Sequence, residues 1–324
     1  IMYSKDKGVV LISILLIVLL LSSVAVLFGN KYFLSLQRAQ YIEFQTLSLN
    51  IFRNIESLAK DKIEKELRFN RNKLTKNNPI INEPLVFNLN GVDIIGKISD
   101  SGNCFNINSI VTLNDGKYVE NKKTSAAFRK ILSLKEIENN VIEEVIDQTI
   151  DWIDKDSNPR AYGLEDYYYS GPLHNPREYT GMRLMVSIEE LKSIPSVKQI
   201  DWTIFKDYFC AMPSASELSL NINTLDLKDA YLLSSIFPNL SIKDAEYILD
   251  NIPESGFDDL NNFMRNFPDL DFDLAYGNIT VSSNIFEIKS EVRFNEFMSS
   301  SKSKIIYENN NNNGFIISRI YNGI

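Results

Sequence analysis

An uninterrupted apolar run from Val9 to Phe28 is the dominant pattern of the chain, and the short charged segment Lys5-Asp6-Lys7-Gly8 precedes it. The run contains three serines and no charged residue. As a helix rising about 1.5 Å per residue it would span about 30 Å, the thickness of a bilayer core. The rest of the chain is polar and holds no second stretch of this kind, so the pattern predicts a single-pass membrane protein with one large polar body.

Apolar residues continue at mostly three- and four-residue spacing beyond this run, with charges between them, which is typical of an amphipathic helix: Phe44, Leu47, Ile51, Ile55, Leu58, Ile63 and Leu67. No proline occurs before Pro79. We therefore expect one helix from about Val9 to Phe69, about 90 Å long, which the segment Lys76-Asn77-Asn78-Pro79 terminates. Such a helix can lie in a membrane or pack against copies of itself in a fibre.

The polar body alternates between two kinds of pattern. Strand-like segments come first, and Asn90-Gly91 between two of them predicts a hairpin: Leu85–Leu89, Val92–Ile98 and Cys104–Asn108. Helical periodicity then extends from about Thr124 to Asn266. Strand patterns return at the end, with the polar loop Asn309–Asn313 before the last of them: Ile279–Ser282, Ile285–Phe297, Lys304–Tyr307 and Phe315–Ile320. Three tandem units would fit equally well, but the strand groups are small for separate domains, which favours a helical domain inserted into one sheet.

Composition narrows the functional classes. The formal net charge of −8 argues against nucleic-acid binding, which depends on Lys and Arg neutralising phosphates. A single histidine, His174, leaves no second candidate for a histidine-based triad and no zinc cluster. The two cysteines, Cys104 and Cys210, could form one disulfide in an oxidising compartment, or remain as two buried thiols.

The acidic segment 151–166 has the highest density of side chains that could bind a metal ion or act in catalysis. Asp154, Asp156 and Asn158 alternate, and Glu165 follows eleven residues after Asp154, which approaches the ligand spacing of an EF-hand loop. Pro159 stands where such a loop requires glycine, so this is not a regular EF-hand. Crowded carboxylates still favour a hard cation such as calcium. A solvated acidic turn that caps a helix is the alternative, and a hydrolytic pair formed by Asp154 and Glu165 is a third.

Short helical units follow the acidic segment. Ser187 and Glu190 have the spacing of a capping box. Farther on, two short helices around the turn Pro238–Ser241 resemble a helix-hairpin-helix unit. In nucleic-acid-binding hairpins, glycines let backbone N–H groups reach phosphate; this turn has no glycine and acidic surroundings. The units therefore indicate a compact helical scaffold, and a membrane-anchored periplasmic nucleic-acid receptor remains the alternative function.

Three interpretations of the N-terminal segment compete. A cleaved signal peptide could use Ser23-Val24-Ala25 as its cleavage site. A plain signal anchor is the second interpretation. In the third, a leader is cut directly after Gly8 and the apolar run is retained. The amphipathic pattern that follows Phe28 favours retention.

Taken together, these features resemble the minor pseudopilin K family of the type II secretion system, also called general secretion pathway protein K, over nearly the whole chain. Gly8 followed by Val9-Val10-Leu11-Ile12 resembles a prepilin cleavage site. The other matching segments follow in the order of the family: Cys104–Asn108, Asp151–Asp156 with Gly163–Tyr168, Ser187–Leu191, Cys210–Pro213 and Leu220–Thr224.

The resemblance implies an assembly component rather than an enzyme. It implies cleavage by prepilin peptidase after Gly8, methylation of Val9 and a position at the tip of the pseudopilus with minor pseudopilins I and J, above the inner-membrane secretion platform. The chain would cross the bacterial inner membrane once, with its C-terminal body in the periplasm, and help to export folded proteins. Ser13 stands where most pseudopilins carry a glutamate that pairs with a neighbour's N-terminal ammonium; the family similarly lacks it, which suits a tip subunit with no neighbour above.

The resemblance also implies an α+β pseudopilin fold, in which the long N-terminal helix packs on a small antiparallel sheet that carries a large inserted all-helical domain. It also supports the expectation of a disulfide between Cys104 and Cys210 and of a structural calcium ion. For this ion we expect these ligands: Asp151, Asp154, Asp156, Asn158, Glu165 and Asp166. The expected boundaries are a leader at 1–8, a membrane segment at 9–28, the periplasmic part of the helix at 29–75, sheet residues at 76–120, the inserted domain at 121–275 and C-terminal strands at 276–324.

Overall fold

The computed structural model describes residues 6–69, 73–89, 91–172, 175–215, 217–307 and 314–323. His174, Asn90 and the loop Asn309–Asn313, which entered the expectations above, lie outside the described residues. Gly8 and Val9 lie within the first helix, and their side chains are also outside the description.

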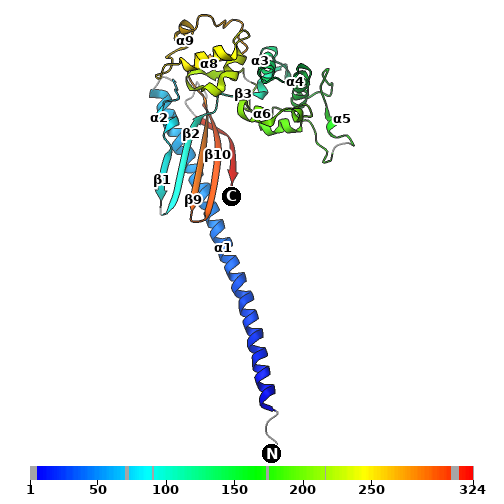
Figure 1. The fold of residues 1–324 in the computed structure, drawn as a ribbon, viewed down its shortest axis with the longest axis vertical. Helices are drawn as coiled ribbons and strands as arrows, with labels where there is room; N and C mark the ends of the chain where they lie inside the picture. The colour runs from blue at the N-terminus through cyan, green and yellow to red at the C-terminus, as the bar shows by residue number, and fades with distance from the viewer. Residues whose placement is uncertain are drawn as a thin grey trace, which may run out of the picture.

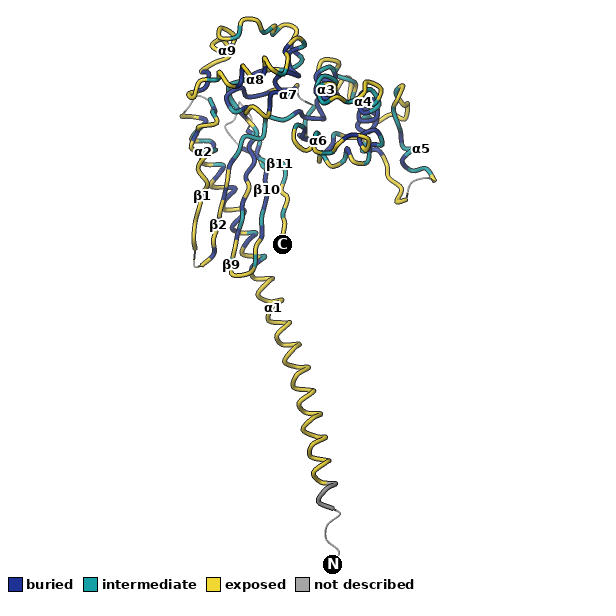
Figure 2. The backbone as a smooth tube through the Cα atoms, in the orientation of Figure 1, coloured by how far each residue is buried: buried dark blue, intermediate teal, exposed yellow. Residues whose placement is uncertain are grey.

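One helix, α1 (Asp6–Phe69), forms the stem of the molecule, and this confirms the helix expected from the apolar pattern (Figure 1). Residues 10–43 are exposed along its whole circumference, whereas from Phe44 onward one side is buried (Figure 2). By length and composition, the apolar part of α1 can cross a membrane. The helix therefore combines an exposed half, long and apolar enough to cross a membrane, with a second half that is part of the folded body.

The buried side of α1 packs on one face of a five-stranded antiparallel sheet, with the order β1-β2-β9-β10-β11. The strands are β1 (Leu85–Leu89), β2 (Val92–Asp100), β9 (Ile285–Phe294), β10 (Phe297–Tyr307) and β11 (Gly314–Asn322). The expected hairpin joins β1 to β2, where Leu89 pairs with Val92 and Gly91 has a φ of 81°. Phe52, Ile63 and Phe286 are fully buried between helix and sheet. This arrangement confirms the expected pseudopilin-like fold.

The stretch between β2 and β9 forms the inserted unit, which has a hydrophobic core separate from that of the stem and sheet. Its longer helices are α3 (Lys122–Leu134), α4 (Asn139–Ile153), α6 (Trp202–Tyr208), α7 (Ala230–Ile236), α8 (Ile242–Asp250) and α9 (Leu260–Asn266); α5 (Asp166–Tyr169) is one turn long. Five 3₁₀ turns, Ile107–Ile110, Ile188–Ser193, Val197–Gln199, Ile222–Thr224 and Leu227–Asp229, connect them within the described residues. Figure 1 shows α3 to α6 projecting sideways from the head of the body, while α8 and α9 cover its end.

The inserted unit begins earlier than expected, because residues 105–120 do not join the sheet. They form β3 (Phe105–Asn106), β4 (Val111–Asn114) and β5 (Lys117–Glu120); β4 pairs with β5, and β3 pairs in parallel with β6 (Phe209–Cys210). The reason is packing: the Phe105 ring lies 5.5 Å from that of Phe128 and 5.2 Å from that of Phe209, inside the core of the inserted unit. At the other boundary, β8 (Asn278–Thr280) pairs with β7 (Ser219–Asn221) rather than with the sheet.

Two local expectations were also wrong. Asn78-Pro79 does not terminate α1, which ends at Phe69, but starts the short helix α2 (Pro79–Asn82), because the Asn78 side chain accepts a hydrogen bond from the N–H of Ile80 at 2.9 Å. The expected single strand 285–297 is a hairpin of β9 and β10 that turns at Asn295, whose φ is 52°.

Side-chain hydrogen bonds fix the inserted unit on the sheet. Asp100, at the end of β2, accepts hydrogen bonds from the Thr224 hydroxyl at 2.5 Å and from the Ser283 hydroxyl. Desolvation by burial raises the pKa of Asp100 above its ordinary value, and these hydrogen bonds partly offset that effect. Asn221 donates from its amide to the Leu74 carbonyl at 3.1 Å. The head therefore has a defined orientation relative to the stem.

Candidate metal centre

The acidic segment lies at the far end of the inserted unit, where α4 stops and the chain returns to α5 (Figure 1). The last turn of α4 is buried, with Trp152 and Ile153 in the core, and this holds Asp151 and the C-terminal cap residue Asp154 in place. Glu165 occupies the N-cap position of α5. Both ends of the acidic loop are thus tied to helices.

This fold brings three of the expected ligands together. One carboxylate oxygen each from Asp154, Asp156 and Glu165 lies within 4.8 Å of the others. Glu165 is 1% exposed, and the adjacent Asp151 is fully buried. Within the described residues, Asp151 Oδ1, Asp154 Oδ1 and Glu165 Oε1 are buried without a hydrogen-bond partner. Buried carboxylate oxygens without donors are rare in native proteins, so this donor set fits a hard, oxygen-preferring cation.

The cluster is electrostatically unfavourable in the absence of a cation. Burial, reinforced by the neighbouring carboxylates, raises the pKa of Asp154 to about 7 and that of Glu165 to about 7. Burial likewise raises the pKa of Asp151 to about 6, although the N–H of Arg160 partly offsets the shift. Each shift reflects the cost of holding negative charge in a desolvated group. A divalent cation would remove this cost.

A second group of residues supports the loop. Asp147, one turn before Asp151, accepts from Arg160 Nε at 2.7 Å and from the N–H of Tyr162 at 3.1 Å. Arg160 also donates to Glu120 at 2.6 Å, and its N–H reaches Asp151 Oδ2 at 3.1 Å. These contacts hold the loop against α4 and orient the Asp151 side chain.

Gly163 is required by the same geometry. A Cβ at this position would lie 1.7 Å from Asp151 Oδ2 and 2.8 Å from the backbone nitrogen of Arg160. Gly163 was noted only as part of a segment that matches the family. Asp147 and Arg160 were missed in the sequence, although the spacing of Asp147 and Asp151 places both carboxylates on one helix face.

Asp166 and Asn158, like Asp151, lie outside the three-carboxylate group. Asp166 Oδ1 accepts from the N–H and the hydroxyl of Thr180 at 2.7 and 2.8 Å, so it holds the segment that follows α5. Asn158 is exposed, and its N–H donates to Asp156 Oδ1 at 3.0 Å. That contact shapes the turn and orients Asp156.

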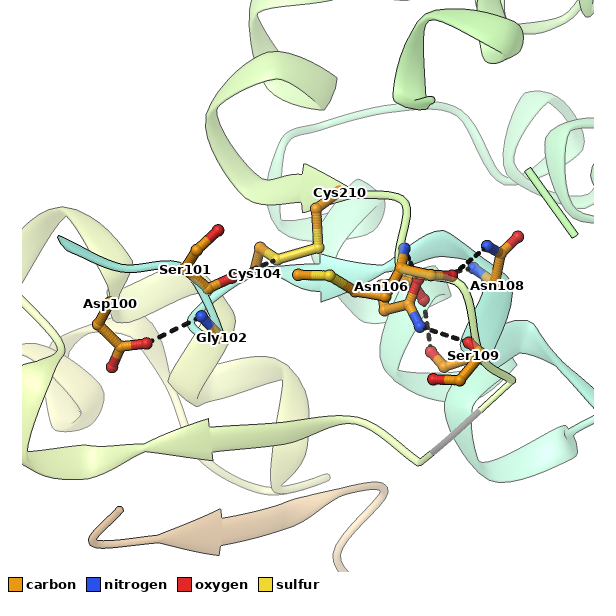
Figure 3. The surroundings of a disulfide bond; sticks show 10 residues. Asp100, Ser101, Gly102, Cys104, Asn106, Asn108, Ser109 and Cys210 are labelled. Atoms are coloured by element: carbon orange, nitrogen blue, oxygen red, sulfur yellow. Dashed lines mark hydrogen bonds between the residues drawn. A yellow bond between two sulfur atoms is a disulfide. The ribbon is translucent and has the colours of Figure 1, made fainter. Parts of the chain in front are cut away.

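Cys104 and Cys210 form a disulfide where β3 and β6 pair, with their Cα atoms 5.9 Å apart (Figure 3). Asn106, beside the bridge, accepts from the N–H of Met212 at 2.9 Å and donates to the Ser214 carbonyl at 2.9 Å. Asn108 donates to the Met185 and Met212 carbonyls at 2.8 and 2.7 Å. The bridge and the two asparagines therefore hold three distant segments together.

The stem, the sheet and the inserted helical unit together define a pseudopilin. Two family models, both described as type II secretion system (T2SS), protein K, match residues 103–214 and 220–276, more than half of the chain. The chain belongs to this family and is a minor pseudopilin of the type II secretion system. The family is a structural component of that system.

Relatives and one solved structure agree with this assignment. Type II secretion system protein K of Pectobacterium carotovorum subsp. carotovorum is 29% identical over 240 residues, covering 74% of this chain and 72% of the relative. The protein of the same name from Aeromonas hydrophila is 27% identical over 239 residues, covering 72% and 71%. A chain in the crystal structure of the GspK-GspI-GspJ complex from enterotoxigenic Escherichia coli has the same fold, with a TM-score of 0.74 and 20% identity over 88% of this chain and 99% of that chain.

Proposed function

We propose that this minor pseudopilin caps the tip of a periplasmic pseudopilus and helps to move folded proteins across the outer membrane. One observation carries the tip position: the inserted unit projects sideways from the head, at the opposite end from the apolar stem (Figure 1). Pilin-like subunits stack through their N-terminal helices, so a subunit with this much bulk at its head obstructs the next one. It can be accommodated only where no subunit follows.

The exposed stem supports the rest of the assignment. Residues 10–43 are exposed in the folded chain, and we infer that the apolar part lies in the bacterial inner membrane, with the body in the periplasm. Prepilin peptidase would cut after Gly8 and the new N-terminus at Val9 would be methylated. Ser13 then lies at mature position five, where a tip subunit needs no carboxylate to neutralise a neighbour's ammonium.

Partners are proposed by analogy with the solved relative, which forms a complex with GspI and GspJ. We propose that this chain binds minor pseudopilins I and J of its own system and stands above the inner-membrane secretion platform. The test is to co-purify its body, residues 30–324, with the corresponding bodies of I and J and measure the mass of the complex. One copy of each is the expected result. Failure of the body to bind I and J, or its assembly into fibres without them, would refute the tip position.

At the acidic loop we propose a structural calcium ion held by Asp154, Asp156 and Glu165, with Asp151 beside them. The ion would supply positive charge to a buried acidic cluster and so tie α4 to α5. We assign no catalytic role to this cluster, and we propose that the chain is not an enzyme. Metal-dependent hydrolysis by the purified body would contradict this.

The nucleic-acid alternative gains no support. A phosphate-binding hairpin would present backbone N–H groups to its ligand. At the turn Pro238–Ser241, backbone carbonyls instead contact a lysine: Lys130 Nζ lies 2.6 Å from the carbonyl of Phe237, just before the turn, and 2.8 Å from that of Leu240. The surroundings are acidic, which disfavours phosphates.

A further inference from the structure

The inserted unit carries a groove that is separate from the acidic loop. It runs between the α7–α8 turn and the segment that follows α9. Figure 1 shows α8 and α9 at the end of the body farthest from the N-terminus. Its volume is about 540 Å³, within the range of clefts that bind ligands. Eight of its thirteen lining residues are apolar or aromatic, among them Tyr247, Phe267 and Pro268. Tyr247 is 64% exposed, so part of this apolar surface faces water.

The first wall of the groove is fixed by a lysine from another helix. Pro238 follows α7, and the turn it begins leaves backbone carbonyls without helical partners. Lys130 of α3 lies within hydrogen-bond distance of four carbonyls, those of Ser234, Phe237, Pro238 and Leu240, at 2.6–3.1 Å, and its three N–H groups are shared among them. The turn therefore has one defined shape and needs no ligand to order it.

The opposite wall and the floor are also fixed. Aromatic rings pack beneath the groove: Phe237 lies 5.1 Å from Phe272, and Phe263 lies 5.4 Å from Phe267. Asp271 Oδ1 accepts from the N–H groups of Asp273 and Leu274 at 3.0 and 3.1 Å, which shapes the segment after α9. A surface ordered in this way loses little conformational entropy on binding.

The charge of the groove has one sign. Asp244, Asp269 and Asp271 line it, and no Lys or Arg does. Within the described residues, none of the three carboxylates forms an ion pair. Residues 237–276, which surround the groove, contain nine Asp and Glu and two Lys and Arg. This segment alone accounts for −7 of the net charge of −8, so its field attracts cations and repels phosphates and anionic lipids.

We propose that this groove binds an extended, cationic segment of a partner protein. An apolar side chain of that segment lies against Tyr247 and Phe267, and a neighbouring Lys or Arg lies beside Asp269 and Asp271. The exposed Tyr247 ring also favours an Arg or Lys above its face. Carboxylates that form no ion pair within the described residues and a pre-ordered apolar floor are the combination that such a segment requires. The surface follows from this chain alone and does not depend on its position in a pseudopilus.

The test uses the full chain in detergent micelles with calcium present. The probe is a fluorescent peptide of about eight residues that carries arginine and phenylalanine, with two companions in which glutamate replaces arginine or serine replaces phenylalanine. At about 50 mM salt we expect the first peptide alone to bind, and binding to weaken as salt is raised. Asp269→Asn with Asp271→Asn should weaken it at least about tenfold, and Tyr247→Ala at least about fivefold. The Asp271→Asn change keeps a side-chain oxygen that can accept from the N–H groups of Asp273 and Leu274.

Matched controls separate the groove from the general field. Glu246→Gln with Glu254→Gln removes the same charge from exposed positions outside the groove, and Tyr179→Ala removes a tyrosine that is 63% exposed elsewhere. Both should bind as the parent does, and all variants should keep its melting temperature. Equal weakening in the groove and control variants would overturn the proposal, because a diffuse field would then explain binding. Failure of the arginine–phenylalanine peptide to bind, or preference for duplex DNA, would overturn it as well.

Discussion

Glu56 of α1 and Arg319 of β11 form a forked ion pair that joins the stem to the last strand of the sheet. Arg319 Nη2 lies 2.9 Å from Glu56 Oε2, and Arg319 Nε lies 3.0 Å from each carboxylate oxygen. Glu56 is 3% exposed, and the Ser303 hydroxyl also donates to it. The carboxylate therefore depends on these partners, and β11, an edge strand, is held against the helix through them.

Removal of the arginine should destabilise the body. Arg319→Met leaves the buried Glu56 carboxylate without its cation. Breaking a fully buried ion pair costs about 3–5 kcal/mol of stability. Because the Arg319 side chain is 42% exposed, we expect the free energy of unfolding to fall by about 2 kcal/mol. The measurement is urea unfolding of the body. Arg293→Met is the control, because its pair with Glu291 is exposed and its loss should cost under about 0.5 kcal/mol. Equal effects of the two variants would contradict the role given to Glu56.

Calcium should stabilise the body. A ligand present at about one hundred times its Kd adds about 2.7 kcal/mol of stability, which corresponds to a rise in Tm of about 5–10 °C for a domain of this size. A chelator should therefore lower the melting temperature by that amount, as followed by calorimetry. An unchanged Tm would rule out a stabilising ion.

A variant at the cluster should separate the ion from the fold. Asp154→Asn removes one of three crowded carboxylates. We expect it to abolish the calcium-dependent rise while making the calcium-free protein more stable, because less repulsion remains. Asp250→Asn, at an exposed position on α8, should leave the calcium response intact. Loss of the response in both variants would show that the cluster is not its origin.

The calcium-free body should lose stability as pH rises. The folded pKa values of Asp154 and Glu165 are about 7, above their ordinary values of 3.8 and 4.5. Between these limits the native state holds more protons than the unfolded state, so stability falls from about pH 4 to pH 7. Calcium affinity should show the opposite trend and weaken below about pH 7, because protons compete with the ion. Urea unfolding midpoints measured at pH 5 and pH 7.5 without calcium test this. An equal change in midpoint between the two pH values in the parent and in the double variant Asp154→Asn with Glu165→Gln would contradict it.

The disulfide should contribute strongly to stability. Its cysteines are 106 residues apart, and a bridge that closes a loop of about this length contributes about 3–5 kcal/mol. Cys104→Ser with Cys210→Ser should therefore lower the Tm of the body. Dithiothreitol should lower the Tm of the parent towards the same value and leave the double variant unaffected. A parent that melts identically with and without reductant would contradict this contribution.

The sequence predicted the elements with long, regular patterns. The stem and the β1–β2 hairpin were found because periodicity and turn chemistry are local signals. Strand β10 was placed too short because its first half is a serine run: Ser299, Ser301 and Ser303 are buried there although their composition does not indicate a core strand. Pairs such as β3–β6 involve two residues from each side and carry no pattern.

The acidic site was predicted in part for the same reason. The alternation of Asp154 and Asp156 and the position of Glu165 gave the three grouped carboxylates. What holds them was missed, because Arg160 contacts Asp147 and Glu120 through hydrogen bonds that span 13 and 40 residues. Asn106 and Asn221 are similar cases: each starts a 3₁₀ turn by accepting the N–H two residues on, while its amide binds a distant segment. Such contacts are defined only once the chain has folded.

The N-terminal mass of the mature protein tests the central claim most directly. The chain should be expressed together with the prepilin peptidase of its own system, isolated from the inner membrane and digested, and its first peptide weighed. We predict a peptide that begins at N-methylated Val9, and an uncut leader in Gly8→Ala. A mature chain that starts beyond residue 25 and is recovered without membrane would contradict the account of an anchored pseudopilin.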